Sequence, residues 1–365
     1  MTTRRTFLAG AGLTAAAAAA RPALASPLSP DDMPANPEGG RYRPPWKIGM
    51  GGGPMANGRQ VKPEREILEA VEAAWDSGMR YFDTSPWYGL GLGERRFGLY
   101  LHDKPRDEVV ISTKIGRVLT PDPSVDQVGS WMAPGPFDYE FDFTAEGTRR
   151  SVEDSLHRLG MAHLDIVFIH DLEEGQARIG DWEEQFEIAL EGAMPELERM
   201  KEEGLIKAWG MGVNRIEPAV RSFREADPDI LLLATQYSLM EHERALDEVF
   251  PLVEEAGGSI VVGAPLNNGF LSGRDRYNYG PDIPDGAFEK RARLSAVCHA
   301  HEVDMRTAAL QFTAAPDVVS ATIPGSRNLR QSVENAASMT AAIPADFWAE
   351  LKSEGLIAEN APVPA

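Results

Sequence analysis

The chain has one cysteine and far fewer basic than acidic side chains. Cys298 stands alone among 365 residues, so no intramolecular disulfide forms and no metal site built on several thiolates is expected. The 36 lysines and arginines are outnumbered by 56 aspartates and glutamates, which gives a formal net charge of −20. Nucleic acids and anionic membranes are held by clustered basic side chains, so we expect neither as a partner.

Residues 1–25 differ in composition from the rest of the chain. Arg4 and Arg5 precede an apolar run that ends at Ala20. The run is short for a membrane span and dominated by alanine, which favours a targeting segment over an anchoring helix. The arginine pair resembles a twin-arginine signal, and Ala23–Ala25 has the small-x-small pattern that signal peptidases prefer. We therefore expect cleavage after Ala25, export by the twin-arginine translocase, and a periplasmic or other extracytoplasmic protein without a membrane anchor.

Composition divides the remaining chain into three segments. Residues 26–45 contain six prolines and no hydrophobic periodicity, which predicts a linker. Residues 46–355 are expected to form a single folded domain, and residues 356–365 a C-terminal tail.

Within the folded domain, short β-branched or apolar runs alternate with amphipathic stretches, as in repeated βα units around a parallel sheet. The candidate strands are residues 46–50, 80–84, 109–114, 164–170, 206–213, 230–236, 259–264 and 318–323. The helical patterns with recognisable ends are residues 67–75, 151–159, 195–203, 217–226, 246–256, 288–303 and 328–339. Eight strands alternating with these helical patterns predict the α/β class and a single (β/α)8 TIM barrel.

An open doubly wound sheet uses the same alternation and is the structural alternative. It requires a Gly-x-Gly-x-x-Gly turn between its first strand and first helix. Glycines at 49, 51, 52 and 53 lack that spacing and are not followed directly by a helical pattern. The sequence therefore favours the barrel.

Four polar residues lie at or just beyond predicted strand ends. Asp83 sits at the end of the second strand and Tyr88 just beyond it, Lys114 ends the third strand, and His170 ends the fourth. The carboxyl ends of the strands share one rim of a barrel, which is where catalytic groups gather. Taken singly, each residue also fits an ordinary structural role, but their positions at successive strand ends favour a common site.

This set of side chains suits proton transfer coupled to hydride transfer at a carbonyl carbon. Tyr88 is expected to donate or accept the proton, for which its pKa must fall from the usual value near 10. A neighbouring Lys114 ammonium favours the phenolate, and Asp83 holds that lysine charged. His170 is expected to orient the carbonyl oxygen.

The motifs around these residues resemble those of the aldo-keto reductase superfamily. Residues 82–94 are similar to the family segment that carries its aspartate and tyrosine, residues 112–114 to its lysine motif, and residues 156–170 to the segment before its histidine. The resemblance extends from residue 46 to about 339. It is nearest to the branch of D-threo-aldose 1-dehydrogenases, which includes L-fucose and pyridoxal dehydrogenases, in residues 110–117, 168–171, 210–214, 263–271 and 298–312.

The resemblance implies NADP or NAD as the cofactor and assigns residues to it. Asn214 and Gln236 match positions that hold the nicotinamide carboxamide. The pyrophosphate segment corresponds to Leu266, Asn268, Gly269 and Leu271, and the phosphate and adenine segment to Gly325, Ser326, Arg327, Glu334 and Asn335.

Three positions depart from the family pattern. Val213 replaces a common serine, no aromatic residue stands near Gly263 to stack on nicotinamide, and Gly325 replaces a lysine that often contacts the 2′-phosphate. Arg327 and Arg330 are available for that phosphate, so NAD and NADP both remain open.

A long insertion at residues 117–143 follows the third strand and contains Trp131 among other aromatic residues. With Trp87 it is expected either to form an aromatic wall for a sugar or pyridine ring or simply to pack as a loop.

These features predict an NAD(P)-dependent oxidoreductase that interconverts a sugar hemiacetal or aldehyde with its lactone or alcohol. Because free nicotinamide cofactor is scarce outside the cytoplasm, an exported enzyme is expected to retain its cofactor and recycle it with a second substrate. The alternative from another class is a non-enzymatic nicotinamide-binding module that senses redox state, which the complete set of four residues disfavours.

Overall fold

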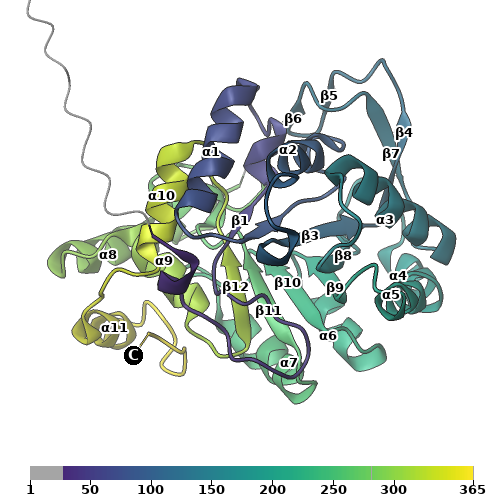
Figure 1. Ribbon diagram of the computed structural model, residues 1–365. Helices are drawn as coiled ribbons and strands as arrows, with labels where there is room; N and C mark the ends of the chain where they lie inside the picture. The colour runs from purple at the N-terminus through teal and green to yellow at the C-terminus, as the bar shows by residue number, and fades with distance from the viewer. Residues whose placement is uncertain (1–27, 281, 365) are drawn as a thin grey trace, which may run out of the picture.

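A computed structural model describes residues 28–280 and 282–364, which form a ring of parallel strands surrounded by helices (Figure 1). The predicted signal peptide lies outside the described residues. Among the residues that are described, no helix is both long and apolar enough to cross a bilayer.

The central sheet has eight parallel strands in the order of the chain. Parallel bridges from Ile48 to Thr322 and from Gly51 to Gly325 join the last strand to the first and close the barrel. The predicted (β/α)8 barrel and all eight predicted strands are confirmed, although most strands are shorter than predicted. They are β1 (Gly49–Gly51), β2 (Tyr81–Asp83), β3 (Val110–Ile115), β8 (Ile166–His170), β9 (Ala208–Val213), β10 (Ile230–Ala234), β11 (Ser259–Gly263) and β12 (Val319–Ile323).

A helix follows each barrel strand. These helices are α1 (Glu64–Asp76), α2 (Leu92–Leu101), α3 (Ala145–Leu159), α5 (Ala193–Glu202), α6 (Ile216–Glu225), α7 (Phe250–Glu255), α9 (Met305–Ala314) and α10 (Leu329–Ser338). Three more lie outside this ring: α4 (Trp182–Glu191), α8 (Ala287–Ala300) and α11 (Ala345–Ser353).

Helices α2, α4, α9 and α11 were not predicted, and α3 begins earlier than predicted. In α2, glycines break the apolar pattern because the helix lies close to α3: a Cβ on Gly98 would stand 2.5 Å from the Leu159 carbonyl oxygen. Helix α3 begins at Ala145 because the Thr144 side chain accepts a hydrogen bond from the Gly147 amide and caps it. Local capping and close helix packing therefore explain these differences.

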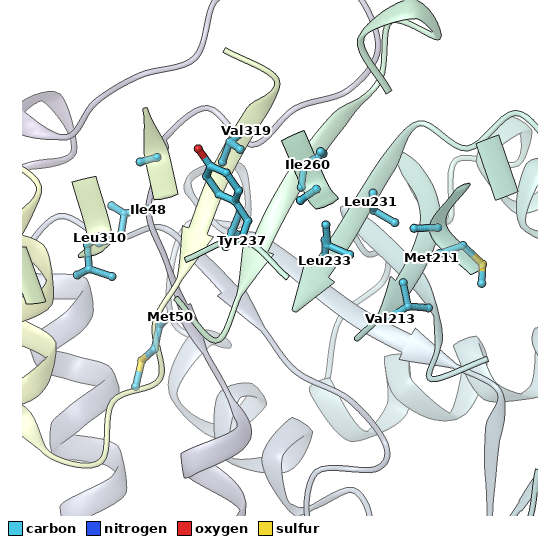
Figure 2. Close-up of a cluster of buried hydrophobic side chains, with 14 of the residues drawn as sticks. Ile48, Met50, Met211, Val213, Leu231, Leu233, Tyr237, Ile260, Leu310 and Val319 are labelled. Atoms are coloured by element: carbon cyan, nitrogen blue, oxygen red, sulfur yellow. The ribbon is translucent and has the colours of Figure 1, made fainter. Parts of the chain in front are cut away.

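Alternate residues of each strand face two different apolar layers. Leu231 and Leu233 of β10 point outward into the layer between the sheet and the helices, part of which is shown in Figure 2. Ile230, Leu232 and Ala234 belong to the layer inside the barrel. Successive side chains of a strand point to opposite faces, so each strand contributes to both layers. The same alternation fixes which residues at the strand ends face the barrel axis.

The predicted linker packs against the barrel. Tyr42 and Trp46 contact the inner apolar layer. Asn36 donates to the Ser320 carbonyl at 2.6 Å, and Arg43 donates to the Gly258 and Asp317 carbonyls. These partners lie at or just before the amino-terminal ends of β11 and β12, so residues 28–47 close the end of the barrel opposite the predicted site.

The predicted C-terminal tail is also packed. Leu356, Ile357 and Ala361 are buried, and the Ala358 amide donates to His242 Nε2 at 3.0 Å. Cys298 is buried as well, and burial raises the pKa of its thiol to about 11, as expected of a packing residue.

The insertion after β3 forms two short antiparallel ribbons. Strand β4 (Arg117–Pro121) pairs with β7 (Phe137–Phe141), and β5 (Gln127–Val128) pairs with β6 (Trp131–Met132). Leu119 and Tyr139 pack with Leu90, which belongs to the loop after β2. The insertion therefore stands over the carboxyl ends of β2 and β3.

Candidate active site

The four predicted proton-transfer residues line one cavity at the carboxyl ends of the strands. Asp83 ends β2, Tyr88 lies in the following loop, Lys114 lies in β3, and His170 ends β8. The cavity has a volume of about 870 Å³ and extends across the barrel mouth to the loops after β11 and β12. It is large enough for a dinucleotide together with a small substrate.

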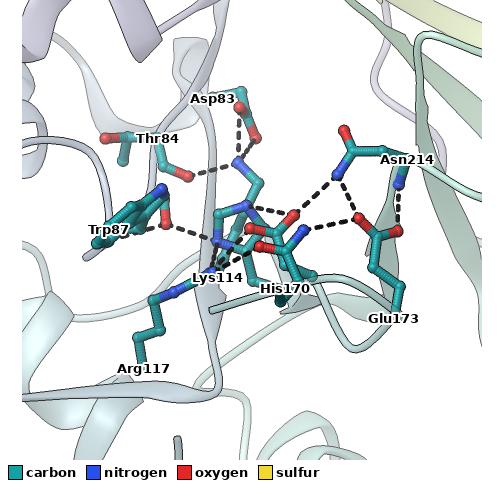
Figure 3. Close-up of polar contacts among 11 residues, drawn as sticks. Asp83, Thr84, Trp87, Lys114, Arg117, His170, Glu173 and Asn214 are labelled. Carbon is teal, nitrogen blue, oxygen red and sulfur yellow. Dashed lines mark hydrogen bonds and ion pairs between the residues drawn. The ribbon is translucent and has the colours of Figure 1, made fainter. Parts of the chain in front are cut away.

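Lys114 is fixed by three acceptors. Its Nζ lies 2.9 and 2.8 Å from the two carboxylate oxygens of Asp83 and 2.8 Å from the Thr84 carbonyl oxygen (Figure 3). The Ser112 hydroxyl donates to Asp83 at 2.8 Å. An ammonium has three donors, so Lys114 is fully satisfied with its Nζ 4.7 Å from the centroid of the Tyr88 ring.

The electrostatics of Tyr88 differ from the expectation. Its pKa is raised well above 10, chiefly by burial and then by the charges of Asp83 and Asp171, while Arg117 opposes the shift. This direction is opposite to the one expected from a neighbouring Lys114 ammonium, because burial of the ring is the largest influence on the pKa. Tyr88 is therefore a protonated phenol, which suits it to donate a proton.

His170 is held by two partners at Nδ1. The Ser85 hydroxyl lies 3.0 Å from that nitrogen and a guanidinium nitrogen of Arg117 lies 3.3 Å from it. Burial and the charges of Arg117 and Lys114 lower the pKa of His170 well below 6.5. The imidazole is consequently neutral, and its ring stands 5.9 Å from that of Tyr88, nearly perpendicular to it.

Asn214, predicted to hold the nicotinamide carboxamide, is oriented by two carboxylates that the sequence pattern did not single out. Its Nδ2 donates to Asp171 at 3.0 Å and to Glu173 at 2.7 Å, and its backbone amide donates to Glu173 at 2.7 Å (Figure 3). Gln236 Nε2 donates to the Asn214 carbonyl at 2.7 Å. With its amide nitrogen engaged, Asn214 presents its side-chain oxygen as an acceptor at the cavity wall.

The backbone is strained where several strands meet this cavity. Asp171, Thr235 and Ala264 directly follow β8, β10 and β11, with φ angles of 50°, 66° and 51°. Residues other than glycine seldom adopt this left-handed backbone conformation, which costs about 1 kcal/mol or more. Such strain gathers at functional sites and is consistent with a site at this rim.

The predicted cofactor residues divide into two groups. Eight line the cavity: Asn214, Leu266, Asn268, Gly269, Gly325, Arg327, Glu334 and Asn335. Three stand behind its wall. Gln236 positions Asn214, Leu271 packs in the core, and the Ser326 hydroxyl accepts from Asn335 at 3.2 Å.

Four arginines gather where the pyrophosphate segment was predicted. Arg59, Arg274, Arg276 and Arg327 line the cavity, and none forms a salt bridge with a carboxylate in the described part of the chain. Burial and the other three arginines lower the pKa of Arg276. Such mutual repulsion in an acidic protein is relieved by a bound polyanion, so these residues fit the phosphates of a nicotinamide dinucleotide.

Of these arginines only Arg327 was predicted. Arg59 lies in the loop after β1, and Arg274 and Arg276 lie in the loop after β11. All belong to loops at the carboxyl ends of strands, which is the one signal in the sequence that points to them.

Both predicted substrate residues line the cavity. The rings of Trp87 and Trp131 lie 6.1 Å apart at 84°, and Trp131 lies 5.7 Å from the Tyr88 ring. Trp87 also packs edge-on against Tyr139 at 4.9 Å. The insertion therefore packs as a folded unit and at the same time places an aromatic surface beside Tyr88.

Comparison with known proteins agrees with this geometry. The model of the aldo/keto reductase family matches residues 47–354. D-threo-aldose 1-dehydrogenase from a Pseudomonas species is 36% identical over 320 residues, covering 85% of this chain and 94% of the relative. Pyridoxal 4-dehydrogenase from Microbacterium luteolum is 34% identical over 331 residues, with the same coverage of 85% and 94%.

Solved structures show the same fold. A Bacillus halodurans aldo-keto reductase in its holo form superposes with a TM-score of 0.65 at 23% identity, covering 87% of this chain and 94% of that one. A Klebsiella pneumoniae aldo-keto reductase in complex with NADPH superposes with a TM-score of 0.61 at 20% identity, again covering 87% and 94%.

Proposed function

The chain belongs to the aldo/keto reductase family, and from that premise we propose that it oxidises the C1 hemiacetal of an aldose to a lactone, or reduces a related aldehyde. As a family member it is an NAD(P)-dependent oxidoreductase. The proposal is supported by the cavity that Tyr88, His170 and Trp131 line, in which the Tyr88 ring lies 5.9 Å from that of His170 and 5.7 Å from that of Trp131. Two dehydrogenases that are similar to this chain, one named for an aldose and one for pyridoxal, point to the same chemistry.

In this proposal each of the four side chains supports one proton transfer. When bound, the nicotinamide supplies or accepts the hydride. In reduction, the Tyr88 hydroxyl donates a proton to the oxygen of the substrate carbonyl, and His170 orients that oxygen. In oxidation, the Tyr88 phenol first gives its proton to water, and the resulting phenolate accepts the proton of the C1 hydroxyl. Lys114 and Asp83 keep the surroundings of Tyr88 rigid and charged, which preorganises the proton transfer.

The tryptophan surface supports a ring-shaped substrate. A pyranose ring has an apolar face of axial C–H groups, and a pyridine ring is flat and aromatic, so each packs well on indole rings. Trp131 stands beside Tyr88, which would bring the C1 position of a stacked sugar near the proton donor.

Spectrophotometry tests this function directly. Absorbance at 340 nm is followed with a panel of aldoses and aldehydes and with either NAD or NADP. We expect turnover of at least one aldose, lost in Tyr88→Phe while cofactor binding is retained. Cofactor binding without turnover of any aldose or aldehyde would contradict the proposal, and unchanged biological activity of Tyr88→Phe would favour the redox-sensing alternative.

We further propose that the protein is exported by the twin-arginine route with its cofactor already bound and recycles it with a second substrate. Two observations support this: the arginine pair at Arg4 and Arg5, and the four arginines that would hold the cofactor phosphates. Protein purified from the periplasm should release one equivalent of nicotinamide dinucleotide on denaturation. Recovery of the protein from the cytoplasm alone, or of periplasmic protein free of dinucleotide, would overturn this proposal.

A further inference from the structure

Arg117 is a buried cation beside the proposed active site. It is the first residue of β4, and its side chain is 3% exposed. Its guanidinium carbon lies 4.7 Å from the Trp87 ring centroid and 4.5 Å from that of Phe141. One guanidinium nitrogen lies 2.9 Å from an Asp171 carboxylate oxygen. Aromatic faces and one carboxylate therefore hold this cation in a single place.

The same guanidinium nitrogen lies 3.3 Å from Nδ1 of His170, as Figure 3 shows. A guanidinium has only donors and does not lose its proton in proteins. Nδ1 must therefore present its lone pair to Arg117, and the proton of the neutral imidazole must sit on Nε2. The Ser85 hydroxyl, 3.0 Å from Nδ1, is compatible because a hydroxyl can donate as well as accept.

Nε2 is the ring nitrogen that can donate a hydrogen bond to a molecule in the cavity. It makes no hydrogen bond to the described residues, and its nearest carboxylate oxygen, on Asp171, is 3.5 Å away. That oxygen already accepts from Asn214 at 3.0 Å. A proton on Nε2 is thus available to an oxygen atom of a molecule in the cavity that His170 lines.

The charges facing His170 act in the same direction. Arg117 of β4 and Lys114 of β3 both oppose a second proton on the imidazole, and the carboxylate of Asp171 forms an ion pair with Arg117. Tyr88, from the loop after β2, is a neutral phenol. Removing the Arg117 charge would leave Asp171 uncompensated beside the ring and make the imidazolium easier to form.

We propose that Arg117 is a positioning residue that fixes His170 as the neutral tautomer with its proton on Nε2, ready to donate to the substrate oxygen. The identity of that oxygen rests on the proposed function, whereas the tautomer does not. Arg117 is held between Trp87 of the β2 loop and Phe141 of β7. The insertion to which Arg117 belongs therefore sets the hydrogen-bonding state of His170, in addition to forming part of the expected substrate surface.

Nitrogen NMR of protein labelled with ¹⁵N-histidine tests the tautomer without any substrate. His170→Asn assigns the signal. We expect the wild-type His170 to show a protonated Nε2 and an unprotonated Nδ1, with no titration between about pH 5 and 8. In Arg117→Met, which keeps an unbranched apolar stem but removes every donor, we expect a titrating ring with mixed tautomers. Arg117→Lys retains a donor and should restore the wild-type tautomer at least in part.

Arg178→Met is the matched control. Arg178 lies 4.6 Å from the Tyr139 ring and pairs with Asp138 at 2.6 Å, so it contacts the same β4–β7 ribbon as Arg117. It has no hydrogen bond to His170. Its replacement should leave the His170 signal unchanged. A wild-type ring protonated at Nδ1, or an Arg117→Met spectrum equal to that of Arg178→Met, would overturn the proposal. The wild-type measurement decides even if Arg117→Met does not fold.

Turnover provides the second measurement. With an active aldose, kcat/KM of Arg117→Met should fall by about 100-fold, the usual cost of misplacing a reacting group, with cofactor affinity unchanged. Its remaining activity should decline as the pH falls below about 6.5, because the imidazole now gains a proton, whereas wild type and Arg178→Met should not show this decline. If wild type turns over no substrate, the proposed function fails, and the NMR result still decides the role of Arg117.

Discussion

Lys114 donates to both carboxylate oxygens of Asp83, at 2.9 and 2.8 Å, and neither side chain is more than 2% exposed. The pair is thus held away from water at the carboxyl ends of adjacent strands β2 and β3. Burial raises the pKa of Asp83 above its ordinary value, and the Lys114 ammonium and the Ser112 hydroxyl offset part of that rise. Each charge therefore depends on the other.

Removing one member of this pair should destabilise the protein strongly. Asp83→Asn leaves the Lys114 ammonium buried with its carboxylate partner gone, and we expect a loss of about 3–5 kcal/mol in the free energy of unfolding. Urea unfolding followed by circular dichroism measures the loss. The double variant Asp83→Asn/Lys114→Met should recover much of the stability but none of the activity. If the double variant is no more stable than Asp83→Asn, the two charges do not compensate each other as the geometry indicates.

The raised pKa of Tyr88 predicts the pH dependence of reduction. Burial and the charges of Asp83 and Asp171 keep the phenol protonated at pH values above 10. A proton donor remains active while it holds its proton, so kcat/KM for aldehyde reduction should not fall between about pH 6 and 9. Steady-state rates across that range, with stability checked at each pH, measure this. A decline with an apparent pKa near 7 or 8 would show that Tyr88 ionises more easily than its surroundings imply.

The four arginines predict opposite effects on cofactor binding and stability. Arg276→Gln removes one charge from a cluster whose members repel one another. Without cofactor the variant should be at least as stable as wild type, whereas the Kd for NADP or NAD should rise by about tenfold, which corresponds to about 1.4 kcal/mol. Fluorescence titration and thermal unfolding measure the two quantities.

The control for this experiment is Arg293→Gln. Arg293 lies on α8, pairs with Glu354 and does not line the cavity, so its replacement should leave the cofactor Kd unchanged. Wild-type affinity should also fall as salt is added, because the attraction between arginines and phosphates is screened. Equal effects of Arg276→Gln and Arg293→Gln would show that the cluster does not contact the cofactor.

Trp131 is expected to contribute to substrate binding rather than to cofactor binding. Trp131→Ala removes the ring that stands 5.7 Å from Tyr88, so KM for an aldose should rise by about tenfold or more while the cofactor Kd is unchanged. Initial rates at saturating cofactor measure this. A Trp131→Ala enzyme with unchanged KM for every active sugar would place the substrate elsewhere in the cavity.

Much of the fold and the proton-transfer site could be predicted from the sequence because each depends on local, repeating features. The continuous apolar run in segments such as Ile230–Ala234 indicates a strand that is buried on both faces. Once eight such strands are counted, barrel geometry requires that residues at their carboxyl ends meet at one rim. Asp83, Lys114 and His170 stand at those ends and therefore lie together.

The packing of the chain ends and the charges around Tyr88 were harder to predict from the sequence. The proline-rich segment 28–45 has no periodicity, yet Tyr42 and Asn36 find partners at the amino-terminal ends of strands far along the chain. The Tyr88 pKa depends first on how deeply the ring is buried and then on the charges of Asp83, Asp171 and Arg117, which are set by the closed barrel.

The sequence by itself determined the barrel, the family resemblance and the shared rim of the four proton-transfer residues, because strand periodicity and residue order along the chain are sufficient for these. Only the tertiary structure decided that Arg117 contacts His170, that Asp171 and Glu173 orient Asn214, and that four arginines from three loops share one end of the cavity. Loops have no repeating pattern that fixes their direction. Their side chains meet only when the barrel closes and brings together residues that are as much as 268 positions apart, as Arg59 and Arg327 are.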